Sequence, residues 1–202
     1  MALLRRSIAA LLLAGLAAAP ALAADPFVTV KPPAEGPANS AFWILDMESR
    51  PDGSSVAGLP LAQLNNAQGR AGPRWCAADP LTAASFASTD PAVSAEIRQY
   101  LGGPDGNIFR ATTRMTGAPV LALVGNYRTC NGEAAPFLLL VDQSQRRPRV
   151  VYIRSFPDWT PFIALRADGN RLVVSSCLEC DHAEILSYNR RTRRFSWRSA
   201  GP

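Results

Sequence analysis

Alternating and continuous apolar segments dominate the second half of the chain and predict a series of β-strands. Residues 108–115 place Phe109, Thr113 and Met115 on one face and arginines on the other, as in a strand with one buried face. Continuous apolar runs at 120–124 and 137–141 predict central strands that are buried on both faces. Five shorter apolar segments extend the series: 150–153, 162–165, 172–174, 185–188 and 195–197.

The turns between these segments favour an antiparallel meander. Asp168-Gly169-Asn170 contains residues that tolerate a positive φ, which is typical of a hairpin turn. Successive turns of a single meander alternate between the two ends of its sheet. The turns at 143–148, 167–170 and 189–193 would then share one end, and the loops at 130–135, 156–160 and 178–182 would share the other.

Helical patterns are confined to the first half. Asp90 and Pro91 supply an N-cap and a first-turn proline, and apolar residues then recur at helical spacing until Gly102. The similar pair at 79–80 predicts a helix of one or two turns over 81–87. Residues 59–64 fit a helix or a strand equally well, and 42–45 predict a first strand. The predicted class is therefore α+β, with a short N-terminal helical region packed on a mostly β, antiparallel meander.

The N-terminus has the three parts of a secretory signal peptide. Arg5 and Arg6 precede a short apolar run, and Ala21-Leu22-Ala23 provides small residues for cleavage. Cleavage after Ala23 would place the mature chain in the periplasm or outside the cell, with no transmembrane segment remaining. We therefore expect a signal peptide at 1–23, an extended proline-rich leader at 24–39 and a single globular domain at 40–202.

Arginine is unevenly distributed along the chain. From Pro136 onward there are 11 arginines against 6 acidic residues, whereas 24–135 contains 8 basic and 10 acidic residues. The basic turns contain Arg146, Arg147, Arg190, Arg191, Arg193 and Arg194. If these turns share one end, the arginines form a patch that suits an anionic envelope component or an envelope protein. The alternative is solvated charge that prevents edge pairing, and export makes nucleic acid an unsuitable partner.

The four cysteines predict disulfide bonds, because an even count in an exported chain is typical of a disulfide framework. We expect the pairs Cys76–Cys130 and Cys177–Cys180. The second pair lies in a loop with His182, the only histidine, and near Asp158 and Trp159 if the loop ends meet. Its spacing also permits a zinc or copper site, with Glu179, Asp181 or Cys130 as a further ligand. A thiol-redox pair is a third interpretation, although reactive pairs usually lie at a helix N-terminus. We favour the disulfide and expect no cofactor.

Catalytic motifs are not found in the sequence. It contains no nucleophile elbow, phosphate loop or HExxH, and any histidine-dependent mechanism must use His182. The close carboxylate pairs, Asp46/Glu48 and Glu179/Asp181, are expected to face solvent. We therefore expect an exported binding or inhibitor-type module and not an enzyme, with the arginine patch and Trp159 as binding candidates. The alternative is a metal-binding or thiol-redox accessory protein that uses Cys177, Cys180 and His182.

Overall fold

The protein is mostly β in a computed structural model, which describes residues 25–31, 46–102, 108–144, 146–177 and 183–200. The first seven strands are β1 (Val28–Val30), β2 (Met47–Ser49), β3 (Ser55–Val56), β4 (Leu59–Pro60), β5 (Trp75–Pro80), β6 (Phe86–Ala87) and β7 (Arg110–Thr113). The next seven are β8 (Val120–Thr129), β9 (Ala134–Asp142), β10 (Arg149–Ser155), β11 (Ala164–Asp168), β12 (Arg171–Ser175), β13 (Ala183–Asn189) and β14 (Arg194–Ala200). The helices are α2 (Leu61–Gln68), α3 (Pro91–Leu101) and a 3₁₀ helix at Ala83–Ser85.

The central sheet has the order β10-β9-β8-β5, and β7 also pairs with the start of β8. Every residue of β9 from Ala135 to Asp142 is buried, as its continuous apolar run predicts for a strand covered on both faces. One face, with Leu138 and Leu140, belongs to a core cluster shared with β1, α3 and the C-terminal strands. The other face, with Phe137 and Leu139, packs in a second cluster that includes Leu64 of α2. The strands β8 and β9 therefore separate two cores.

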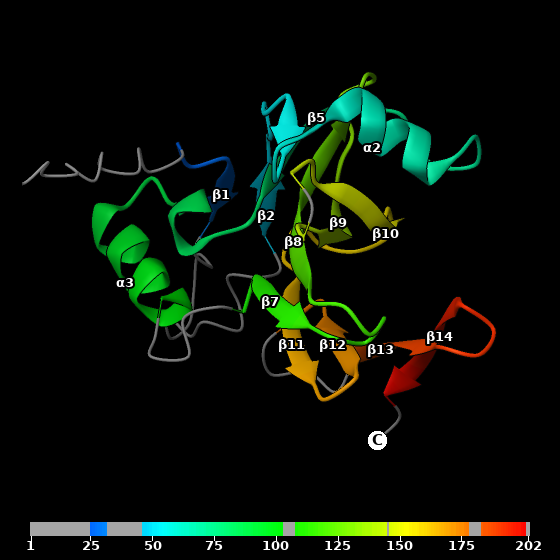
Figure 1. Cartoon of the computed structure of the whole chain (residues 1–202). Coiled ribbons are helices and arrows are strands. Elements are labelled where there is room, and N and C mark those ends of the chain that lie inside the picture. Colours follow the sequence, from blue (N-terminus) through cyan, green and yellow to red (C-terminus); the bar gives the residue numbers. More distant parts are fainter. Residues whose placement is uncertain (1–24, 32–45, 103–107, 145, 178–182, 201–202) are drawn as a thin grey trace, which may run out of the picture.

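The C-terminal strands form a separate antiparallel sheet in the order β11-β12-β13-β14, below the central sheet in the view of Figure 1. The prediction of one continuous meander is wrong at this point, because β10 pairs with β9 and β11 pairs with β12. Between β10 and β11, Phe156, Phe162 and Ile163 are buried in the core. A connection anchored by three buried side chains crosses from one sheet to the next and does not form a hairpin loop.

The helix at 91–101 is confirmed in detail. Asp90 is the N-cap and its side chain accepts a hydrogen bond from the backbone N–H of Ala92 at 2.8 Å, and Gly102 is the C-cap. The ambiguous segment at 59–64 is divided between β4 and the start of α2. The described residues thus contain two α-helices, but these alternate with strands β3 to β6 and do not form a purely helical N-terminal region.

The predicted helix over 81–87 is replaced by the 3₁₀ helix and β6. Asp79 caps no helix: its Oδ2 accepts hydrogen bonds from the backbone N–H groups of Asp52 and Gly53, at 2.8 and 2.9 Å. Pro80 is the last residue of β5, which pairs with β8 as far as Gly125. Pairing with a central strand holds this segment extended and overrides the local Asp-Pro signal.

The leader expected at 24–39 is part of the core where the structure describes it. Residues 28–30 form β1, which pairs with both β2 and β6. Val28 and Val30 are buried in the first core cluster. Apolar side chains on alternate positions allowed this short stretch to join a sheet despite its proline-rich surroundings. The strand predicted at 42–45 lies outside the described residues.

Within the described part of the chain, no helix has the length and hydrophobicity needed to cross a lipid bilayer.

Candidate functional site

The C-terminal sheet has one buried face and one exposed face, as strand alternation requires. Leu165, Leu172, Val174 and Leu186 are buried and turn toward the central sheet. The residues between them in each strand form the opposite face, which we call the outer face. The register aligns outer-face residues of all four strands in rows.

Two rows of the outer face contain three arginines and one aspartate. One row runs Arg166, Val173, Ile185 and Arg198 across β11, β12, β13 and β14. The adjacent row runs Asp168, Arg171, Ser187 and Ser196. Arg194 faces the same side as Arg198, four residues earlier in β14. The outer face therefore presents four arginines against one aspartate.

The arginines form two pairs on either side of an uncharged centre. Arg166 and Arg171 lie on neighbouring strands at one edge, and Arg194 and Arg198 lie on the strand at the other edge. Three strand spacings place the two edge strands about 14 Å apart. Val173, Ile185 and Ser187 lie between the pairs and are half-buried. This arrangement suits an extended anionic partner better than one small ion.

These four guanidinium groups are available to a partner. All four residues are exposed, and none of their side chains has a hydrogen bond or ion pair with another described residue. Arg154 on the inner side shows the opposite situation. It pairs with Glu184 at 2.8 Å and lies over the rings of Phe156 and Trp197, at 4.7 and 4.3 Å from their centroids. Arg154 therefore links the two sheets, whereas the outer arginines hold no element in place.

The turn at 189–193 continues the basic surface. The Asn189 side chain accepts hydrogen bonds from the N–H groups of Arg191 and Thr192, at 3.0 and 3.1 Å, which fixes the turn. Arg190 donates to the carbonyl oxygens of Arg114 and Met115 and so fastens the turn to the segment after β7. Arg191 and Arg193 are exposed. Of the candidates in this turn, Arg190 has a structural role and the other two remain accessible.

The second basic turn, with the exposed Arg146 and Arg147, belongs to the central sheet. It follows the end of β9, where Val141 pairs with Leu121 near the start of β8. Both basic turns thus adjoin the segment between β7 and β8, which Arg190 contacts. No hydrogen bond or ion pair joins the two turns within the described residues, and the single patch stays a prediction.

No protein-family model, curated protein or solved structure matches this chain.

The cysteines are placed as the sequence predicts, as far as the structure describes them. Cys76 and Cys130 form a disulfide bond that links β5 to the end of β8. Cys177 also takes part in a disulfide bond. Its expected partner Cys180, together with Glu179, Asp181 and His182, lies outside the described residues. Cys130 is thereby excluded as a metal ligand in this oxidised state, since ligation requires a thiolate.

The sequence predicts that the loops at 130–135, 156–160 and 178–182 share one end of a sheet. Hydrogen bonds among the described residues bring parts of this end together. The backbone N–H of Phe156 donates to the carbonyl of Pro136, and Thr160 Oγ1 donates to the carbonyl of Ser176. The segment at 156–160 therefore lies against both β9 and the end of β12. No group of three or more His, Cys, Asp or Glu side chains is placed to hold a metal ion within the described ranges.

Trp159 contributes to packing as well as to the surface. Its ring lies 4.4 Å from that of Phe156, centroid to centroid, and it packs against the first core cluster while half-buried. A side chain in this position stabilises the link between the sheets. Trp159 is therefore a weaker binding candidate than the outer-face arginines.

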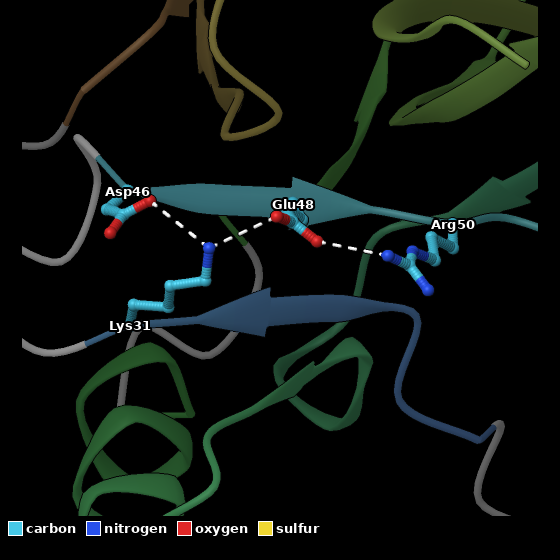
Figure 2. A network of polar contacts seen from close by, with 4 residues as sticks. All are labelled: Lys31, Asp46, Glu48 and Arg50. Atoms are coloured by element: carbon cyan, nitrogen blue, oxygen red, sulfur yellow. Dashed lines mark hydrogen bonds and ion pairs between the residues drawn. The ribbon is translucent and has the colours of Figure 1, made fainter.

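Asp46 and Glu48 face solvent, as expected, and Lys31 neutralises them in Figure 2. Lys31 Nζ lies 3.1 Å from Glu48 Oε1 and 3.9 Å from Asp46 Oδ1, and Arg50 approaches Glu48 at 3.2 Å. The hydrogen bond from Lys31 is the main reason that the pKa of Glu48 is lowered and that of Lys31 is raised. These exposed pairs join β1 to β2 at the surface.

Sequence reasoning missed Arg166, Arg171 and Arg198. Each stands alone among apolar or small residues, so none is part of a basic run in the sequence. Strand alternation across the four strands, combined with the pairing register, would have placed them together. The register, however, is known only from the folded sheet.

Proposed function

We propose that the protein is an exported binding module that recognises a phosphate-bearing partner through the outer face of β11–β14. The observation that carries this proposal is that Arg166, Arg171, Arg194 and Arg198 share the outer face of one sheet. Their side chains have no ionic partner among the described residues. A guanidinium group presents a planar fork of N–H donors that matches phosphate oxygens. Two arginine pairs at opposite edges suit a partner with repeated phosphate groups.

Export is part of the proposal and is supported by the sequence of residues 1–23 and by the disulfide between Cys76 and Cys130. An intact mass that begins at Ala24 in protein from the cell envelope would agree with it. A mass that retains Met1 would contradict it. For the fold class we retain α+β as a proposal, because α2 and α3 both precede β7 to β14.

The test compares binding to phosphate-bearing surfaces by variants that each lose two charges. We expect R166Q/R171Q and R194Q/R198Q to weaken binding to vesicles with anionic phosphatidylglycerol by about tenfold or more, since each basic residue near an anionic surface contributes about 1 kcal/mol. The matched control is R50Q/R98Q, which removes two exposed arginines from outside the sheet. Binding is also measured to vesicles with only zwitterionic headgroups and, separately, to a soluble polyphosphate.

The outcomes distinguish a lipid source of phosphate from a soluble one, and they test whether the outer face is the binding site. Binding to anionic vesicles alone identifies lipid headgroups, and binding to polyphosphate alone identifies a soluble polymer. Either result should weaken steeply with salt, because exposed charges are screened. Wild-type binding by both outer-face variants, or equal loss in R50Q/R98Q, would reject the outer face as the site.

A further inference from the structure

A groove is present at the C-terminal end of α2, on the side of the central sheet away from the C-terminal sheet. This groove of about 410 Å³ lies between the helix and the loop that leads into β5. Its lining residues are Ala62, Asn65, Asn66, Gly69, Arg70, Gly72, Pro73 and Arg74. Small residues and amides form its walls, and two arginines supply its charge. Its volume lies at the lower end of the range for small-molecule sites.

The loop beside the groove is held in place at its C-terminal end. The Asn65 side chain donates to the carbonyl of Trp75 at 2.9 Å and accepts from the N–H of Trp75 at 2.8 Å. Trp75 is buried and stacks on Tyr127, and the next residue, Cys76, is tied to Cys130. The end of the loop is therefore fixed to the core before any ligand arrives.

The loop is also fixed against the helix. Ser155 of β10 donates a hydrogen bond to Gln68 Oε1 at 2.8 Å, which holds the last residue of α2. Gly72 approaches Gln68 so closely that an added Cβ would come within 2.9 Å of the Gln68 Cβ. Gly69 has a φ of 73°, a conformation that glycine adopts without strain. These contacts make the groove a pre-formed feature, so binding pays little to order it.

The charges of the groove specify an anionic ligand. Arg70 and Arg74 are exposed and make no hydrogen bond or ion pair with any described residue, and no acidic residue lines the groove. The C-terminus of α2 contributes a partial charge of about −0.5, which two full positive charges exceed. The absence of large apolar or aromatic side chains from the lining disfavours an apolar ligand.

We propose that this groove binds a small polar ligand through a phosphate or carboxylate group, held by the guanidinium groups of Arg70 and Arg74. The exposed amide of Asn66 supplies a further donor and acceptor beside them. The groove borders α2, which packs in the second core cluster, whereas the outer face lies beyond the first cluster. Figure 1 shows α2 well separated from β14. The site is thus independent of the proposed function.

The test is a titration of the purified protein with inorganic phosphate and, separately, with succinate, followed by amide chemical shifts in NMR. We expect saturable shifts in residues 66–74. R70Q/R74Q should weaken the interaction by about tenfold or more, as expected when charge-assisted hydrogen bonds worth about 1.5 kcal/mol or more are lost. The control R50Q/R98Q removes two exposed charges elsewhere and should titrate like the wild type at residues 66–74.

A second variant tests the groove without changing charge. Ala62 is exposed on α2, and Ala62→Leu fills the groove while keeping a good helix former. We expect it to weaken binding to a similar extent, with unchanged shifts in the core. Response to phosphate alone or to succinate alone identifies the oxyanion. No saturable shift at 66–74 with either probe, or wild-type affinity in Ala62→Leu, would overturn the proposal.

Discussion

Arginine side chains in this protein differ in role according to what surrounds each one. Arg154 lies between aromatic rings and pairs with Glu184, and Arg128 donates to the carbonyl of Pro51. These residues connect segments that are distant in sequence. Arg166 and Arg198 face solvent with no partner in the described chain. Only residues of the second kind can exchange water for an anionic ligand without loss of a structural contact.

The pKa of Asp142 offers a direct test of the contacts at the end of β9. The Ser144 hydroxyl donates to Asp142 Oδ1 at 2.6 Å and the Ser144 N–H donates at 2.9 Å, and these bonds hold the pKa of Asp142 below its ordinary value. Ser144→Ala removes the stronger contribution, so the pKa should rise toward that of a free aspartate. An NMR titration of the carboxyl carbon measures it, with Ser196→Ala as control.

The lowered pKa of Asp142 determines how its contribution to stability depends on pH. Ionised Asp142 contributes stability above the ordinary aspartate pKa of about 3.9, and this contribution is lost as the pH falls through the lower pKa of the folded state. Ser144→Ala should therefore reduce the pH dependence of stability in the acidic range. An unchanged pKa in the variant would show that the hydroxyl does not stabilise the carboxylate.

The predicted Cys177–Cys180 pair can be tested by peptide mapping under non-reducing, alkylating conditions. Cys177 is in a disulfide bond, and Cys76 and Cys130 already pair with each other. We expect a peptide with Cys177 linked to Cys180 and no stoichiometric metal in the untreated protein. Alkylated Cys177 and Cys180 with bound zinc or copper would instead support the metal-binding alternative.

At the scale of elements, one asparagine joins α2 to β5 by hydrogen bonds, beside the packing of Leu64 and Trp75 in the second core cluster. Asn65 makes two hydrogen bonds to the backbone of Trp75, as a neighbouring strand would. Asn65→Ala leaves both backbone groups without these bonds, and we expect the free energy of unfolding to fall by about 1–3 kcal/mol. Urea denaturation measures the change.

Asn66→Ala is the matched control for this prediction. Asn66 is the same residue type in the same helix, but it is exposed and has no hydrogen bond from its side chain in the described structure. Its replacement should change stability by less than about 0.5 kcal/mol. Alanine is the better helix former at both positions, so equal effects of the two variants would mean that the bonds to Trp75 contribute no measurable stability.

At the scale of the whole molecule, the Cys76–Cys130 disulfide closes a long loop. The two cysteines are 54 residues apart, and the segment between them includes α3, β6 and β7. In the chain-entropy model, such a loop stabilises the folded state by about 4 kcal/mol. We expect Cys76→Ser/Cys130→Ser to lower the urea midpoint accordingly.

The control for the disulfide variant is the oxidised wild type under the same conditions, because reduction would also break the disulfide bond of Cys177. If the bond acts through the unfolded state, the double variant should keep the native amide spectrum and lose stability only. Native stability in the variant would show that contacts between β5 and β8 suffice without the covalent link.

The sequence determined the mostly β character of the protein and the positions of most of its strands. The apolar run at 137–141 is buried on both faces in β9, and Asp90, Pro91 and Gly102 bound a helix as predicted. These signals are local: periodicity and capping act within a few residues and need no partner. The pairing of Cys76 with Cys130 was also expected, because an even cysteine count in a chain with a predicted signal peptide favours disulfides.

The tertiary structure alone decided how the strands divide into sheets and which arginines share a face. Residues 75–80 became a strand because β8 offered an edge for pairing, although the local sequence favours a helix start at Asp79. Arg166 and Arg198 share a row because the register brings together positions 32 residues apart. The groove beside α2 likewise depends on Asn65 reaching the backbone of Trp75. Pairing, register and packing arise from contacts between distant segments, whose energies a linear pattern does not contain.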